Sequence, residues 1–127
     1  MRSLRVEPLA MESFGIEPTL DGNVLGVRLT GTGDMAAAAP LGSFFRDVLD
    51  EVKRLGLSAV EIDIRALYFL NSSCLKAFIS FICNVGGQGP KCEVRFVTDA
   101  RLGWQRRSLV ALERMSPSLV SIVEKMK

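Results

Sequence analysis

The chain has 127 residues, which is enough for one domain with its own core and leaves little room for a second. Hydrophobic residues make up 48% of it and charged residues 24%, a globular composition that argues against disorder. The net charge of +2 is too small to indicate nucleic acid or an acidic membrane as a partner. Three cysteines, Cys74, Cys83 and Cys92, lie nine residues apart with no CxxC pair, which fits reduced thiols in a cytosol.

Residues 1–13 show no clear period and lack the continuous apolar core of a signal peptide, so we interpret them as a loosely held N-terminal lead-in. A domain of residues 14–127 is predicted to follow. Residues 67–85 have the length of a membrane span, but polar residues interrupt them. Lys76 near the middle would cost about 2.5–3.5 kcal/mol on insertion. We therefore expect no membrane insertion and a cytoplasmic protein.

Two antiparallel strands are predicted to open the domain. Apolar and polar residues alternate from Phe14 to Leu20, and "DGN" at 21–23 is a hairpin turn signal because Asp-Gly is well suited to positive φ. The next segment, "VLGVRLTG", alternates again and turns its apolar residues to one side; these are Leu25, Val27 and Leu29.

The clearest helix is predicted to follow the loop "GTGDMAAAAP", with Pro40 in its first turn and Gly56 as its left-handed C-terminal residue. Charged residues fall on the opposite face, where Asp50 is spaced to pair with Arg54 one turn on. One helical face is apolar and consists of Leu41, Phe44, Phe45, Val48, Leu49, Val52 and Leu55.

The second half of the chain is predicted to alternate strands and helices. "SAVEIDI" and "KCEVRFVTD" read as strands, residues 73–85 as a helix stopped by Gly86 and Gly87, and residues 101–115 as another helix. The last segment, residues 116–127, fits a strand or a helix. Because the strands have one polar face, we predict an α/β fold with a mixed sheet and helices mainly on one face.

Catalysis is not indicated. The chain contains no histidine, which serves as the base in most serine and cysteine nucleophile sites, so neither Ser72 nor Cys74 has its usual partner. Lys76 lies four residues after Ser72, unlike the SxxK of lysine-assisted enzymes. "GTGD" at 31–34 lacks the rest of a GxGxxG motif and the lysine of a Walker loop. We predict no enzyme and no cofactor.

A nucleic-acid surface is also not indicated. Four arginines share the predicted helix near residues 101–115 with Trp104, but such a helix is usually a solvated face, and acidic residues balance the rest of the chain. The four are Arg101, Arg106, Arg107 and Arg114.

The predicted helix 73–85 is apolar over a wide arc, and only Lys76, Ser80 and Asn84 form a polar stripe on it. Such an arc is either deeply packed or partly an interaction surface. If it is a surface, part of it should be exposed in a monomer or covered by a second copy in a homodimer. That part consists of Cys74, Ala77, Phe81 and Val85.

The adjacent serines Ser72 and Ser73 follow a predicted strand and open a helix. Free backbone N–H groups and the helix dipole favour negative charge at such a position. Taken alone, the simplest interpretation is an N-cap, in which Asn71 or Ser72 accepts a hydrogen bond from those N–H groups.

Two segments, with the predicted order of elements, resemble the STAS domain of bacterial anti-sigma factor antagonists. These are "VRLTGTGD" at 27–34 and "AVEIDIRALYFLNSSCLKAF" at 59–78. The resemblance implies a non-catalytic switch that a serine kinase of the anti-sigma factor type phosphorylates and a PP2C-type phosphatase dephosphorylates, with the unmodified form binding the target. It implies Ser72 as the phosphorylated residue, Ser73 as the second serine, and Asp34 as the acidic residue near them.

Two residues depart from that pattern: Asn71 stands where aspartate is usual, and Cys74 where glycine is usual. Asn71 and Lys76 resemble instead a STAS-like group with a phosphorylated N-[ST]-S-x-x-K motif, some members of which control a diguanylate cyclase. The resemblance thus implies a partner-binding site at Asp34, Asn71, Ser73, Cys74 and Lys76, and either an anti-sigma kinase or a cyclase as target. The alternative is an unphosphorylated STAS scaffold or dimerisation module.

Overall fold

The computed structural model describes residues 4–87 and 92–125. Six strands form one sheet in the order β1-β2-β3-β4-β5-β6. The pairs β1–β2 and β2–β3 are antiparallel, whereas β3, β4, β5 and β6 run parallel. The strands are β1 (Leu9–Ala10), β2 (Phe14–Asp21), β3 (Val24–Gly33), β4 (Ala59–Leu70), β5 (Glu93–Thr98) and β6 (Val120–Glu124).

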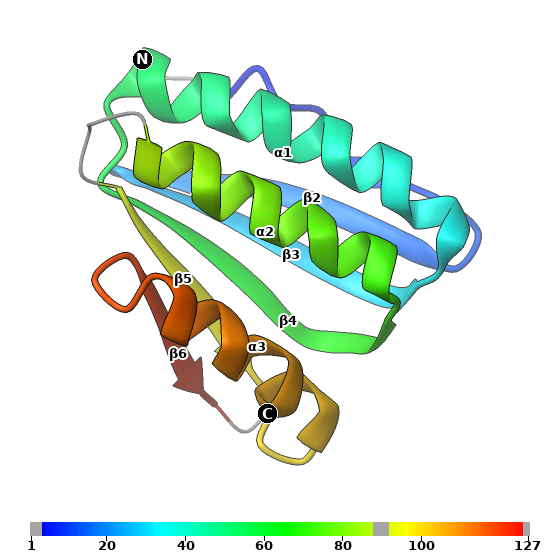
Figure 1. Ribbon diagram of the computed structural model, residues 1–127. Coiled ribbons are helices and arrows are strands. Elements are labelled where there is room, and N and C mark those ends of the chain that lie inside the picture. Colours follow the sequence, from blue (N-terminus) through cyan, green and yellow to red (C-terminus); the bar gives the residue numbers. More distant parts are fainter. Residues whose placement is uncertain (1–3, 88–91, 126–127) are drawn as a thin grey trace.

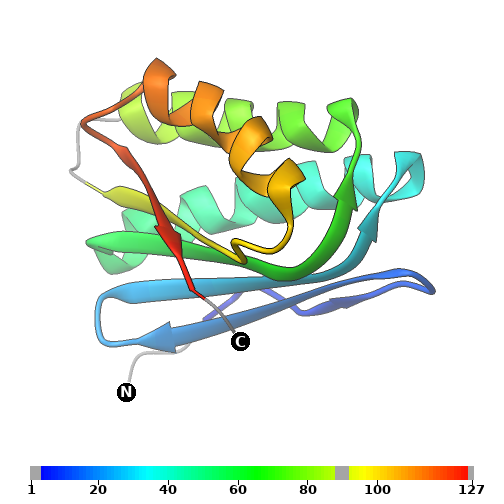
Figure 2. The same ribbon diagram turned by 90° about the horizontal axis from the view of Figure 1, so that it is seen from below.

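Three helices cover one face of this sheet, as Figure 1 and the turned view in Figure 2 show. They are α1 (Met35–Leu55), α2 (Ser72–Gly87) and α3 (Gly103–Met115). Figure 1 shows α1 and α2 side by side over the middle strands and α3 over β5 and β6. The predicted α/β fold with a mixed sheet and helices on one face is therefore confirmed.

The opening hairpin follows its sequence signals. Asp21 pairs with Val24 across a two-residue turn, and Gly22 has a φ of 60°. Such a φ is open to glycine at little cost. On β3, Leu25, Val27 and Leu29 are buried, as the alternation predicts. The strand therefore presents its apolar face to the helices.

Helix α1 begins earlier than the sequence predicts. The side chain of Asp34 accepts a hydrogen bond from the N–H of Ala36 at 3.0 Å, and this cap lets the run of alanines join the helix. Pro40 consequently lies inside the helix rather than in its first turn. The C-terminus is as predicted: Gly56 is left-handed, with a φ of 62°.

Glu51 corrects the predicted polar face of α1. Its side chain is buried, and Arg54 binds it with 2.6 Å between Nη2 and Oε2. The backbone N–H of Arg5 also donates to Oε2 at 3.3 Å. The structure thus pairs Arg54 with Glu51, three residues away, whereas the sequence predicted a pair with Asp50. Glu51 holds the N-terminal segment against α1.

This pair makes part of the stability sensitive to acid. The hydrogen bond from Arg54 holds the pKa of Glu51 below its usual value of 4.5. A depressed pKa means that the carboxylate stabilises the fold above the pKa of the unfolded chain and stops doing so as pH falls through the folded value. We expect Glu51→Gln to lower the free energy of unfolding at pH 7 by about 1–3 kcal/mol, and the difference from wild type to shrink below about pH 4.5.

Urea unfolding at pH 7 and pH 3.5 measures this difference. Asp47→Asn, which removes a charge from an exposed position of the same helix, is the control and should change stability by under about 0.5 kcal/mol at both values. A Glu51→Gln difference that stays constant across pH would contradict the ion-pair explanation.

The N-terminal segment is more ordered than the sequence predicts. Leu9 and Ala10 form β1, which pairs with Ile16 and Gly15 of β2, and Val6 belongs to the buried core. The prediction of a loosely held lead-in therefore does not hold for Val6, Leu9 and Ala10. Two-residue strands carry too little periodicity to be recognised in a sequence.

Two further boundaries differ from the prediction. Helix α2 starts at Ser72 and continues through Gly86 and Gly87, which the sequence suggested as its stop. The last segment, which the sequence left open, contains the strand β6. It pairs with β5 along its whole length, so tertiary pairing decides its conformation.

Candidate functional site

The site lies where β3 and β4 end side by side. Gly33 is the partner of Leu70 at the last position of this parallel pair, and the N–H of Asn71 donates to the carbonyl of Gly33 at 2.8 Å. Asp34 and Asn71 follow these strands directly, and α1 and α2 begin there. The N-termini of two helices therefore meet at the carboxyl edge of the sheet, where the sequence places residues 71–73.

Asn71 is the N-cap of α2. Its side-chain Oδ1 accepts a hydrogen bond from the N–H of Cys74 at 2.9 Å, and its carbonyl accepts one from the N–H of Leu75 at 3.0 Å. The sequence left the cap open between Asn71 and Ser72, and the structure assigns it to Asn71.

Ser72 is exposed at the first position of α2. Across residues 4–87 and 92–125, its hydroxyl has no hydrogen-bond partner. Ser73 is half-buried, and its hydroxyl lies 3.6 Å from the sulfur of Met35 at the start of α1. The two serines therefore differ: Ser72 faces solvent, and Ser73 faces the neighbouring helix.

Cys74 joins the two helix starts. Its side chain is fully buried, and Sγ donates to the carbonyl of Asp34 at 3.4 Å. Burial, with the nearby Asp34 carboxylate, raises the pKa of the Cys74 thiol, so it stays protonated at neutral pH. A Cβ at Gly33 would lie 3.0 Å from Leu70 Cδ1 and 3.3 Å from the carbonyl oxygen of Phe69, so glycine lets β3 approach the end of β4 closely. Because it is buried, Cys74 can affect a partner only by positioning the start of α2. The carboxylate of Asp34, by contrast, is exposed and can contact a partner directly.

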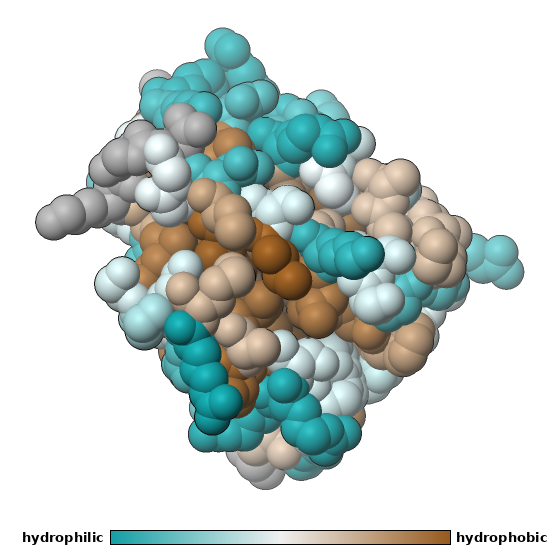
Figure 3. Space-filling model, in the orientation of Figure 1, coloured by the Kyte–Doolittle hydropathy of each residue, from teal (hydrophilic) through white to brown (hydrophobic). Residues whose placement is uncertain are grey.

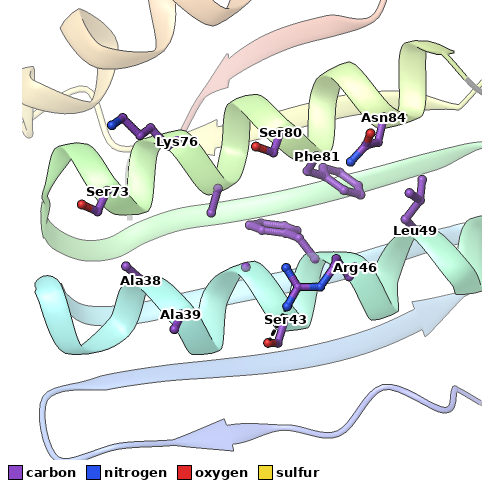
Figure 4. A pocket seen from close by; sticks show the side chains of 13 residues that line it. Ala38, Ala39, Ser43, Arg46, Leu49, Ser73, Lys76, Ser80, Phe81 and Asn84 are labelled. Atoms are coloured by element: carbon purple, nitrogen blue, oxygen red, sulfur yellow. Dashed lines mark hydrogen bonds between the residues drawn. The ribbon is translucent and has the colours of Figure 1, made fainter.

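Lys76 is exposed one turn after the serines. It stands at the rim of a groove between α1 and α2, which has a volume of about 410 Å³. Its lining includes Ser43 and Arg46 on α1 and Ser80 and Asn84 on α2, which Figure 4 shows on the two neighbouring helices.

The part of the apolar arc of α2 that the sequence suggested as an interaction surface is not exposed. The prediction that it is free in a monomer or covered by a second copy is wrong. Cys74, Phe81 and Val85 are buried, and Ala77 is partly buried against the same core. The ring of Phe81 stacks on Phe45 of α1 with 4.9 Å between centroids. α1 occupies this face because its own apolar stripe needs the same cover.

Three large apolar side chains are exposed at the end of β4 and the start of α1, close in the fold or the sequence to the serines. Met35 is 71% exposed, Tyr68 59% and Phe69 52%. β5 pairs with β4 only as far as Asp63, so the end of β4 extends beyond its neighbour. The signal in the sequence is the run "LYF" at 67–69, which breaks the alternation of the strand.

The helical face carries further apolar surface. Figure 3 shows apolar side chains at its centre, over α2 and between α2 and α3. Leu75 and Ile79 of α2 are only half-buried. The helix that starts at the serines is therefore bordered by apolar side chains at its start and along its outer side.

The described part of the chain shows neither a cluster of metal ligands nor a membrane-spanning helix. Residues 4–87 and 92–125 contain no group of three or more metal-binding side chains. Over the same ranges, no helix is both long and apolar enough to cross a membrane.

Comparison with protein-family models finds no match, and a search of curated protein sequences finds none either. Solved structures do match. An anti-sigma factor antagonist from Mycobacterium paratuberculosis superposes with a TM-score of 0.68 at 20% identity, over 90% of this chain and 88% of that one. The antagonist SpoIIAA in its unphosphorylated form gives 0.57 at 12% identity, over 91% and 89%.

A third match comes from the complex of the diguanylate cyclase SiaD with its activator SiaC from Pseudomonas aeruginosa. The TM-score is 0.64 at 17% identity, over 94% of this chain and 99% of that chain. Anti-sigma factor antagonists and this activator thus share one topology with the six-stranded sheet and three helices described above. The chain has the fold of the STAS domain.

Proposed function

We propose that this protein is a cytoplasmic, non-catalytic partner-switching regulator whose binding to a target protein is controlled by phosphorylation of Ser72. The observation that carries the proposal is that one residue at the start of α2 caps the helix and the next one is exposed. Asn71 supplies the cap, and the exposed Ser72 hydroxyl makes no hydrogen bond to any of the described residues. An exposed hydroxyl at the first position of a helix is accessible to a kinase.

The surroundings support an electrostatic switch. Phosphate adds a charge of about −1.5 to −2. On Ser72 it would enter a surface where Met35 and Phe69 are exposed, with Asp34 at the start of the adjacent helix. A partner that covers the apolar side chains would have to desolvate this charge, which is costly without a matching cation. The unphosphorylated form is then the one that binds the partner.

The proposed partners follow from the fold and the motif. They are a serine kinase of the anti-sigma factor type and a PP2C-type phosphatase. A second candidate target is a diguanylate cyclase. Similarity to a chain of the SiaD–SiaC complex supports it, as does the occurrence of both Asn71 and Lys76 in the N-[ST]-S-x-x-K pattern. An unphosphorylated scaffold or homodimerisation module is the alternative to both.

Phosphopeptide mass spectrometry after incubation with a candidate kinase and ATP tests the proposal. We expect one phosphate per chain, located on Ser72. Phosphate on Ser73 alone would move the site by one residue, and the absence of phosphate from both serines with every candidate kinase would favour the scaffold.

A further inference from the structure

We propose that the groove between α1 and α2 is the docking site for an acidic amphipathic helix of a partner protein. The inference deepens the proposed function because it names the chemistry of the partner. It rests on the proposed function only in one respect, which is that a partner protein binds to the surface that contains the groove.

The groove has the dimensions of a helix. Its lining runs from Ala38 to Leu49 on α1 and from Ser73 to Asn84 on α2. Eleven residue steps at 1.5 Å each make it about 17 Å long, which corresponds to about three turns of an additional helix. The two helices run in the same direction, so their starts, at Ala38 and Ser73, stand at the same end of the groove.

Its walls suit close approach of another backbone. Gly42 and Ala77 line it from opposite helices, and the stacked rings of Phe45 and Phe81 lie at its base. Both walls are helices whose backbone groups are bonded internally, so the groove offers no strand edge to an extended peptide. A helix, which satisfies its own backbone and needs only side-chain contacts, is the segment that fits.

The charge of the groove selects the occupant. Arg46 lines the groove from α1, where its Nη2 donates to the hydroxyl of Ser43 at 3.0 Å, and Lys76 lines it from α2. No aspartate or glutamate is among the described residues that line it. The occupant should therefore carry carboxylates beside its apolar stripe.

Selection from a phage-displayed library of 14-residue helical peptides, with one face randomised, tests the proposal on the unphosphorylated protein. We expect the recovered peptides to be enriched in aspartate and glutamate. Gly42→Leu should reduce their affinity at least tenfold because the new side chain fills the groove. A Cβ at Gly42 would meet only Arg46 Nη1 at 3.8 Å, so the substitution introduces no clash at Cβ.

Charge reversal supplies the matched comparison. The double variant Arg46→Glu/Lys76→Glu should also reduce the affinity of the recovered peptides at least tenfold. Lys53→Glu makes the same type of change at an exposed position of α1 outside the groove and should change affinity less than twofold. Peptides that bind Gly42→Leu as tightly as wild type, that show no acidic enrichment, or that cannot be recovered at all would overturn the proposal.

The two proposals can fail separately. Peptide binding is measured without phosphate, so it stands or falls independently of whether a kinase modifies Ser72. Conversely, phosphate on Ser72 together with a groove that binds no acidic helix would retain the switch and place the partner elsewhere.

Discussion

Ser72→Ala is expected to abolish incorporation of phosphate while leaving the fold almost unchanged. The hydroxyl is the proposed acceptor, so its removal eliminates the reaction rather than slowing it. Losing a helix cap usually costs about 0.5–2 kcal/mol. Asn71 caps α2, however, so we expect Ser72→Ala to change the free energy of unfolding by less than about 0.5 kcal/mol.

Ser73→Ala is the matched control, since it removes the same group one residue later. Its hydroxyl lies against Met35 of α1, whereas that of Ser72 is exposed, so phosphorylation of the variant should proceed at close to the wild-type level. Intact-protein mass spectrometry with urea unfolding of each variant measures both effects. Full labelling of Ser72→Ala would refute the assignment of the site.

Ser72→Asp should weaken binding of the target without abolishing it. One carboxylate carries less charge and fewer acceptor oxygens than phosphate, so it imitates the modified state only in part. Isothermal titration of the target with wild type, Ser72→Ala and Ser72→Asp gives the comparison. We expect Ser72→Ala to bind like wild type; equal binding by Ser72→Asp would contradict the electrostatic mechanism.

Gln105→Leu is expected to destabilise the fold by about 3–5 kcal/mol, the largest effect of a single substitution that we predict on stability. Gln105 is fully buried, and its Nε2 donates to the carbonyls of Ile64 at 2.6 Å and Leu67 at 3.0 Å. Its Oε1 accepts from the N–H of Asp99 at 2.9 Å. Leucine can replace none of these bonds, and each buried backbone group left without a partner costs about 1–3 kcal/mol.

Two variants test whether the hydrogen bonds of Gln105 cause this loss. Gln105→Glu should also be destabilised at pH 7, but part of its loss should be recovered at pH 5, since a protonated carboxyl can donate to a β4 carbonyl. Arg107→Ala, at an exposed position of the same helix, should stay within about 0.5 kcal/mol of wild type. A loss below about 1 kcal/mol for Gln105→Leu would mean that neighbouring groups or water replace the bonds.

The position of Gln105 shows why this role could not be read from the sequence. A glutamine in an amphipathic helix is ordinarily interpreted as a surface residue. Here Ile64 and Leu67 lie on β4 beyond the end of its pairing with β5, and their carbonyls accept from Gln105 of α3 instead. Which carbonyls lie beneath a helix depends on how strands and helices stack.

The sequence by itself determined the elements whose signals are local. Alternation over β2, β3 and β4, the Asp-Gly turn, the apolar stripe of α1 and Gly56 at its end were all predicted, because each depends on residues close together in the chain. The resemblance in the motif segments placed residues 71–73 at the exit of a strand, where the structure has them.

Only the tertiary structure decided the features that depend on neighbours distant in the sequence. The packing of α1 against α2 buries Phe81 and leaves a groove between the two helices, which Ala77 and Phe81 of the predicted apolar arc help to line. The early end of β5 leaves Tyr68 and Phe69 exposed, and Glu51 is buried where it accepts a hydrogen bond from the backbone of Arg5, far away in the sequence. Periodicity predicts which face of an element is apolar, but what covers that face depends on the arrangement of the whole chain.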